Sequence, residues 1–260
     1  MIDLDRSLSL SPTNENEWRA FADPAFEANT GMFGGWTAAL MLKAAIEAGG
    51  DYTPAAITVS FARRIEAGAT INVRARPIVS GRSIAQWRVE ITGVDGEVMA
   101  SAAVVSARRR ENDRFVEGVA PHAPAPSEFQ EFHPPGPFGA SVDVRPVSGF
   151  PPLNQADTRT LSWVRDLSGA PLDRVRLGFL ADVAPPRIWL VGERPRPSST
   201  ITMSVYFYAN EEELAAVGSD YILSEVTGVR AEGSVYGHAM RLWSPSGALL
   251  ATSEQLCWFK

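Results

Sequence analysis

Hydrophobic positions in the first half of the chain change from a helical to a strand pattern. Residues 34–48 are apolar almost all round, and Lys43 and Glu47 are their charged side chains. Such a helix must be buried on most sides. Beyond it, Ile71 and Val73 alternate with polar neighbours, as in a half-exposed strand. Short connections favour an antiparallel meander around the helix. The predicted strands are residues 57–63, 70–79, 82–92 and 97–107.

The same order of elements returns in the second half. Residues 83–101 align without a gap with residues 234–252, at an offset of 151 that makes Gly96 equivalent to Gly247. An upstream match has an offset of 144. The difference predicts a seven-residue insertion within the acidic stretch 210–218, and the two colinear matches favour an internal duplication. The second copy is predicted to hold a helix at residues 172–183 and strands at residues 200–208, 221–227, 233–243 and 248–259.

Proline separates the two copies. The segment from residue 121 to residue 137 is rich in proline, which removes backbone donors and favours an extended linker. We therefore expect an N-terminal unit at residues 1–120, a linker at 121–140 and a C-terminal unit at 141–260. The predicted class is α+β, with two antiparallel sheets that are each wrapped around a buried helix.

The composition of the chain argues against several classes of binding partner. The 260 residues carry a net charge of −6, which argues against a general nucleic-acid binder. One cysteine and three scattered histidines offer no pattern for a metal, and we expect no cofactor. The N-terminus lacks a signal-peptide pattern, and the longest apolar stretch, residues 32–42, is too short to cross a bilayer. We expect a cytoplasmic protein without a membrane partner.

Several motifs, in this order and spacing, resemble the acyl-CoA thioesterase II family and its thioesterase-like relatives, which have a double hotdog fold. They cover most of the chain from residue 29 onward. The motifs of the first copy are Asn29-Thr-Gly-Met-Phe-Gly-Gly-Trp36, Val59-Ser-Phe-Ala-Arg-Arg64, Gly81-Arg-Ser83 and Asp95-Gly-Glu-Val-Met-Ala-Ser101. Those of the second copy are Phe179-Leu-Ala-Asp-Val-Ala-Pro-Pro186, Thr200-Ile-Thr-Met-Ser-Val205 and Gly247-Ala-Leu-Leu-Ala-Thr-Ser-Glu-Gln255.

The resemblance implies hydrolysis of an acyl-CoA to a free acid and coenzyme A, and it favours a homodimer. The family orients the attacking water with an Asp, a Thr and a Gln, which correspond here to Asp182, Thr200 and Gln255. A buried carboxylate with a raised pKa would suit a base that activates water. From the residues alone, Asp182 could instead bind nearby backbone or an arginine, and Thr200 and Gln255 could be ordinary strand residues.

The start of the first helix offers a second candidate feature. Free amides at a helix N-terminus can stabilise an oxyanion, so Gly34, Gly35 and Trp36 are predicted to contact substrate. The two glycines could equally serve a tight turn or close packing.

The sequence departs from the family pattern at three positions. Thr202 and Met203 stand where the family strand has Asp and His, and Trp36 follows the glycine pair where Gln is usual. These departures motivate an alternative, a catalytically silent protein that binds acyl-CoA or another acyl thioester. A hotdog hydratase or dehydratase that acts on an enoyl thioester is disfavoured, because no spaced Asp/His pair for acid–base chemistry is evident.

Overall fold

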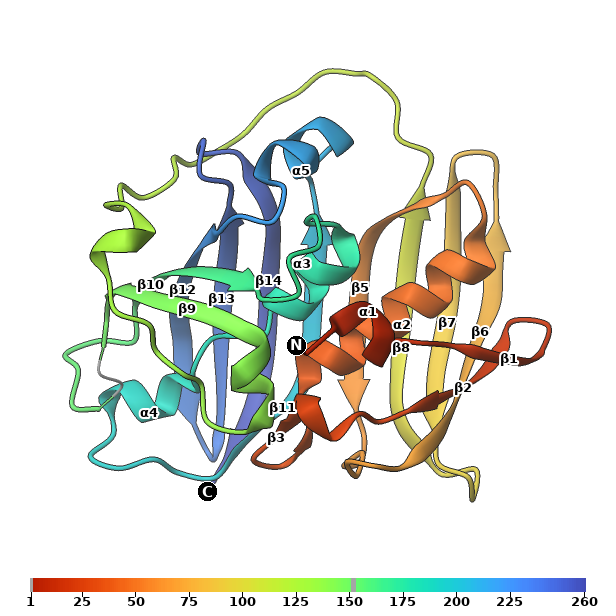
Figure 1. Ribbon diagram of the computed structural model, residues 1–260, viewed down its shortest axis with the longest axis horizontal. Helices are drawn as coiled ribbons and strands as arrows, with labels where there is room; N and C mark the ends of the chain where they lie inside the picture. Colours follow the sequence, from red (N-terminus) through yellow and green to blue (C-terminus); the bar gives the residue numbers. More distant parts are fainter. Residues whose placement is uncertain (1, 151–152) are drawn as a thin grey trace.

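A single antiparallel sheet of twelve strands forms the body of the protein (Figure 1). The computed structural model describes residues 2–150 and 153–260. The strand order is β1-β2-β6-β7-β8-β5-β11-β14-β13-β12-β10-β9. The strands of the first half are β1 (Ser11–Asn14), β2 (Glu17–Phe21), β5 (Thr53–Phe61), β6 (Thr70–Ser80), β7 (Ile84–Thr92) and β8 (Val98–Ala107). Those of the second are β9 (Val142–Ser148), β10 (Thr160–Asp166), β11 (Ser198–Phe207), β12 (Ile222–Glu232), β13 (Val235–Trp243) and β14 (Leu249–Phe259). The short strands β3 (Glu27–Ala28) and β4 (Gly31–Met32) pair separately.

The prediction of two separate sheets is wrong, because β5 and β11 join the halves. Their backbones pair antiparallel, and the hydroxyls of Thr58 and Ser204 lie 3.0 Å apart across the junction. Pairing satisfies the backbone donors and acceptors that each strand would expose as an edge. The halves therefore share one hydrogen-bonded ladder.

The strands of the second half follow the same order, counted outward from the β5–β11 junction, as the strands of the first half. This symmetry confirms the repeated order of elements. From the centre outward, β5 corresponds to β11, β8 to β14, β7 to β13 and β6 to β12, with β2 and β1 matched by β10 and β9. At the junction Val59 pairs with Met203, and these residues are related by the offset of 144. The insertion forms a helix, α5 (Glu211–Val217), which Asn210 and Glu213 cap reciprocally.

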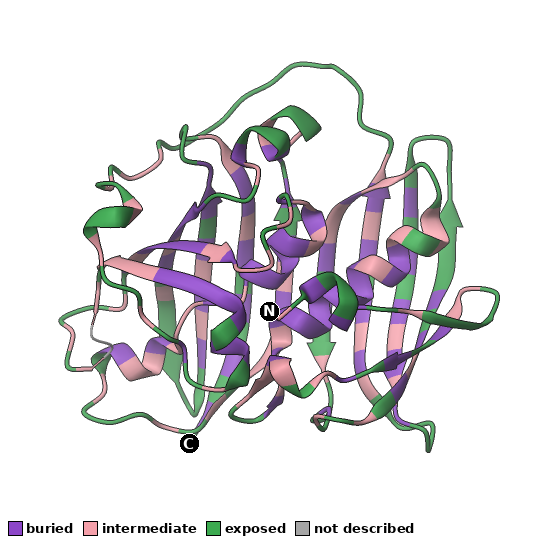
Figure 2. Cartoon of the chain, in the orientation of Figure 1, coloured by how far each residue is buried: buried purple, intermediate pink, exposed green. Residues whose placement is uncertain are grey.

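Two helices lie side by side where the halves meet, as Figure 1 shows. The predicted first helix is α2 (Gly34–Gly49), and it packs against β5, β6, β7 and β8. Most of α2 is buried (Figure 2), as its apolar surface requires. The second helix, α3 (Arg174–Leu180), is shorter than predicted because Asp173 caps its start and the chain turns after Leu180. Asp182 therefore lies in the turn after α3.

The remaining elements border the sheet. They are the helices α1 (Leu4–Ser7) and α4 (Arg187–Val191) and the 3-10 turns η1 (Pro24–Phe26), η2 (Pro126–Glu128) and η3 (Pro137–Ser141). Residues 108–141, which include the predicted linker, run from one half to the other (Figure 1). They form no strand of the sheet, although Phe132 makes a single β-bridge to Val144 of β9. No helix among the described residues is long and apolar enough to span a membrane.

Candidate active site

A cavity of about 540 Å³ lies where the two halves meet, beside the start of α2. Its walls come from six parts of the chain. These are the β3–β4 region with the first residue of α2, the end of β5 with the loop after it, Ala100 of β8, the segment 132–138, the turn after α3, and residues 184–200. Gly34, Asp182 and Thr200 all line it. The structure thus brings three sequence-predicted residues to one concave surface.

Asp182 is fixed at the inner end of this cavity by two hydrogen bonds. The backbone N–H of Gly35 donates to Oδ2 over 2.9 Å, and the amide of Gln255 donates to Oδ1 over 2.9 Å. The carboxylate is deeply set, although its residue stays partly accessible through the cavity. Burial raises the pKa of Asp182 to about 6, against the lowering effect of the bonds from Gln255 and Gly35.

Gln255 links Asp182 to Thr200. It lies on β14 opposite Met203 of β11 and is 6% exposed. The Thr200 hydroxyl donates to the Oε1 atom of Gln255 over 3.0 Å. The Nε2 group of Gln255 in turn donates to Asp182. The three predicted residues therefore form one continuous hydrogen-bonded chain, drawn from the turn after α3, from β11 and from β14. A polar network of this kind holds each member in a defined orientation.

The close packing of α2 against the turn after α3 depends on Gly34 and Gly35. A Cβ atom on Gly34 would lie 2.7 Å from the Asp182 carboxylate, and one on Gly35 would lie 2.3 Å from the carbonyl oxygen of Phe179. The Gly35 N–H is committed to Asp182, whereas Gly34 supplies an amide at the first helical position. Amides of the first turn have no partner within their own helix, so this amide can receive an oxyanion.

Five residues discussed from the sequence lie outside the cavity lining, namely Gly35, Trp36, Thr202, Met203 and Gln255. Trp36 is fully buried, and its indole N–H donates to the Ser7 hydroxyl over 3.1 Å. Met203 is also fully buried, and its sulfur lies 3.5 Å from the Gln255 amide nitrogen. Thr202 follows an irregularity in the pairing of β11 with β14. Met203 thus packs against Gln255, and because Trp36 is fully buried outside the cavity lining, we assign Trp36 no contact with substrate.

Two titratable side chains behind the network do not ionise near neutral pH. His238 pairs with Gln255 across β13 and β14, and burial together with nearby Arg187 lowers the pKa of His238 to about 3. Burial raises the pKa of the Cys257 thiol to about 11. Asp182 is therefore the member of this cluster that changes charge near neutral pH.

Sequence reasoning missed the aromatic wall of the cavity. Phe132 and Phe138 come from the segment predicted to be a linker, and both line the cavity with Phe33. Three phenylalanines between residues 129 and 138 were the available signal, because aromatic side chains gain free energy by packing. The segment predicted to be a linker therefore also contributes to the cavity wall.

Both halves of the chain match models of acyl-CoA thioesterase domains. The family model for the acyl-CoA thioesterase N-terminal domain matches residues 22–107, and the model for the C-terminal domain matches residues 116–259. The chain belongs to the acyl-CoA thioesterase family. The resemblance seen in the sequence motifs is thereby confirmed, and this membership supports thioester hydrolysis in general terms.

Solved structures extend the likeness to the whole fold. A conserved hotdog-fold protein of unknown function from Alicyclobacillus acidocaldarius is 31% identical, with a TM-score of 0.92 and coverage of 99% of this chain and 97% of its own. The acyl-CoA thioesterase II TesB2 from Mycobacterium marinum is 19% identical, with a TM-score of 0.79 and coverage of 99% and 98%. The tesB protein of Mycobacterium avium subspecies paratuberculosis is 18% identical, with a TM-score of 0.83 and the same coverage. No curated protein sequence matches the chain.

Proposed function

We propose that this thioesterase-family protein hydrolyses acyl-CoA thioesters, with water activated by Asp182 and Thr200. The single observation that carries the proposal is the hydrogen-bonded chain Asp182–Gln255–Thr200 at the edge of the cavity. We further propose that the two halves are tandem hotdog units that build one site at their junction, divided by a linker at residues 121–140.

Hydrogen-bond polarity defines the position of the attacking water. Thr200 donates its proton to Gln255, so its oxygen is left to accept a hydrogen bond. Asp182 also accepts. A water molecule between these two groups would donate one proton to each and would point a lone pair into the cavity. Gln255 acts as a positioning residue, because it touches the carboxylate and the hydroxyl rather than the water.

The chemical step then balances without a cofactor. The water oxygen attacks the thioester carbonyl carbon as a proton passes to Asp182, and the Gly34 amide receives the oxyanion of the tetrahedral intermediate. Collapse of this intermediate breaks the carbon–sulfur bond. The departing thiolate takes the proton from Asp182, so the products are a carboxylic acid and the free thiol of coenzyme A.

Hydrolysis of an acyl-CoA panel from acetyl to palmitoyl, followed by thiol release, tests the proposal. Asp182→Asn should lower kcat by roughly 10²–10⁴-fold, the usual contribution of a general base. Asp173→Asn is the matched control, since Asp173 caps the start of α3 and asparagine caps equally well. Thr200→Val should also lower kcat, whereas Thr202→Val on the same strand should not. Absence of turnover with every chain length, together with binding of a non-hydrolysable acyl-CoA thioether, would instead establish the silent binding protein.

A further inference from the structure

A stacked pair of phenylalanines lines one part of the cavity. The rings of Phe33 and Phe138 lie with centroids 4.1 Å apart and planes 6° from parallel. Both residues line the cavity, and they are 5% and 7% exposed. Behind them, Phe33 meets Phe179 edge-on, and Phe179 meets Phe26 in the same way. Phe179 and Phe26 are fully buried, so the stacked pair is backed by close-packed core.

Local backbone contacts hold Phe138 in this position. The Ser141 hydroxyl donates to the Phe138 carbonyl oxygen over 2.7 Å within the turn η3. A Cβ atom on the neighbouring Gly139 would lie 2.1 Å from the carbonyl oxygen of Pro134, so the chain folds tightly on itself here. Gly136 has a φ of +100° and passes against the backbone of β3. These contacts fix the backbone that carries Phe138, and the ring itself stacks on Phe33.

The wall stands directly beside the proposed chemical centre. Phe33 precedes Gly34 in the chain, and its ring lies over Gly35, where a Cβ atom would be 2.5 Å from the ring edge. Arg63, Arg196 and Ser199 line other parts of the same cavity, and they suit the charged carrier rather than a hydrocarbon. When the thioester carbonyl carbon faces Asp182, the acyl chain would therefore lie against the phenylalanine rings that line the cavity.

We propose that the Phe33–Phe138 pair closes the acyl pocket, so the enzyme prefers short acyl groups and Phe138 sets the length limit. The inference rests on the proposed thioesterase function. Each methylene that enters an apolar pocket increases kcat/KM by about fourfold. Chains that reach the wall must displace a packed ring, so kcat/KM should reach a maximum at a short chain and then fall.

The chain-length profile of two Phe138 variants tests this inference. Phe138→Ala should move the maximum of kcat/KM toward longer chains and should raise activity on decanoyl-CoA at least tenfold relative to butyryl-CoA. Phe138→Leu, which retains more of the packing, should produce a smaller shift in the same direction and guards against misfolding of the alanine variant. Phe129→Ala removes a phenylalanine from the same segment outside the cavity lining and should leave the profile unchanged. Folded Phe138 variants with the wild-type profile would overturn the inference.

A separate readout distinguishes this inference from the proposed function. If the wild type hydrolyses no acyl-CoA, the proposed hydrolysis fails, but the pocket can still be examined by calorimetry with non-hydrolysable acyl-CoA thioethers. Affinity that is highest for short chains in the wild type and shifts to longer chains in Phe138→Ala would support the wall. An affinity that increases to palmitoyl equally in both proteins would contradict it.

Discussion

At the residue scale, the ionisation of Asp182 is controlled by opposing effects. Burial pushes the pKa of its carboxyl up to about 6, while the hydrogen bonds from Gln255 and Gly35 favour the charged form. A general base must be ionised, so activity should increase as pH rises through the pKa. We therefore expect the acid limb of the wild-type kcat/KM profile near pH 6.

Removal of the Gln255 amide should shift this limb upward. Gln255→Met deletes the hydrogen bond to Asp182 but keeps an unbranched side chain of similar length. Because that hydrogen bond lowers the pKa of Asp182 and burial raises it, the pKa should increase in the variant. The pH dependence of kcat/KM measures the shift. Glu254→Gln, on the exposed side of the same strand, is the control and should leave the limb in place. A limb that stays near pH 6 in Gln255→Met would show that the amide does not contact the ionised carboxylate.

Sequence motifs could nominate these residues but could not assign their environment. Asp182, Thr200 and Gln255 were named because they match a family pattern, and the structure places them in one hydrogen-bonded chain. The raised pKa of Asp182 depends on burial created by distant segments, which no local pattern encodes. Trp36 shows the reverse case, because its place beside the glycine pair suggested substrate contact while its ring packs against Ser7.

At the element scale, the fit of α2 against α3 depends on two glycines with different neighbours. A Cβ atom on Gly35 would meet the Phe179 carbonyl at 2.3 Å, and backbone cannot yield without moving the turn that carries Asp182. A Cβ atom on Gly178 would meet the Leu42 Cδ1 atom at 2.5 Å, the flexible end of a side chain. The two positions therefore form a natural pair for comparison.

Gly35→Ala should be the more damaging substitution. Overpacking against backbone costs about 1–3 kcal/mol, whereas Gly178→Ala should change the free energy of unfolding by less than about 1 kcal/mol, since alanine also gains helix propensity. Urea unfolding followed by circular dichroism measures both values. Gly35→Ala should in addition lower kcat, because its amide holds Asp182. Equal stability losses at the two positions would refute the distinction between backbone and side-chain contacts.

Elements with a clean hydrophobic period were predicted, and those without one were missed. Strands β5 to β8 and β11 to β14 alternate clearly, and the predictions for them differ mainly at their ends. Strand β9 contains Pro146, which is tolerated because β9 is an edge strand. Strand β10 buries Ser162 and Asp166, so its alternation does not read as apolar against polar. The buried charge of Asp166 is paired with Arg176 of α3, which no local pattern of the strand reveals.

At the scale of the whole molecule, the sequence indicated two copies but could not show that they share a sheet. Alternation of apolar and polar residues with a period of two indicates which face of a strand is buried. It does not indicate which other strand lies beside that strand. The pairing of β5 with β11 was therefore outside the reach of the pattern. The same junction places the start of α2 beside the turn after α3, so the site exists only in the joined molecule.

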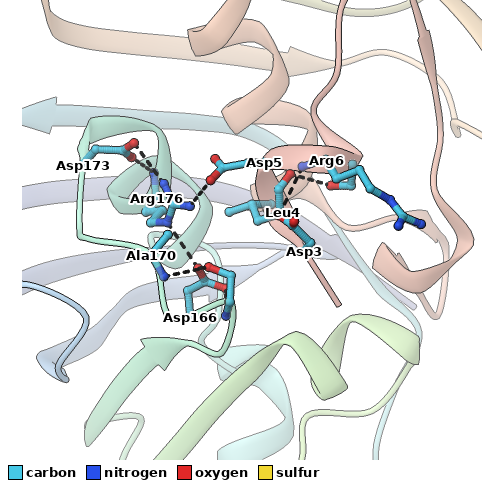
Figure 3. Close-up of polar contacts among 10 residues, drawn as sticks. Asp3, Leu4, Asp5, Arg6, Asp166, Ala170, Asp173 and Arg176 are labelled. Atoms are coloured by element: carbon cyan, nitrogen blue, oxygen red, sulfur yellow. Dashed lines mark hydrogen bonds and ion pairs between the residues drawn. The ribbon is translucent and has the colours of Figure 1, made fainter. Parts of the chain in front are cut away.

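A buried ion cluster also ties the N-terminal helix to the second half. Figure 3 shows Arg176 of α3 between Asp5 of α1, Asp166 of β10 and Asp173. The three contacts measure 2.6, 3.2 and 3.0 Å. The side chains of Arg176 and Asp166 are 4% and 6% exposed, whereas that of Asp5 is 59% exposed. The side chain of Asp173 is 50% exposed, so the cluster has a buried Arg176–Asp166 centre and two exposed carboxylates.

Loss of the central arginine should destabilise both halves together. Arg176→Met leaves the Asp166 carboxylate buried without its cation, at a cost of about 3 kcal/mol. Asp5→Asn removes only an exposed partner and should cost less than about 1 kcal/mol. The sheet is continuous, and α2 of the first half packs against α3 of the second. Calorimetry should therefore give one unfolding transition in the wild type and in each variant, with equal calorimetric and van't Hoff enthalpies. Two resolved transitions in Arg176→Met would show instead that the halves unfold independently and that the β5–β11 junction does not couple them.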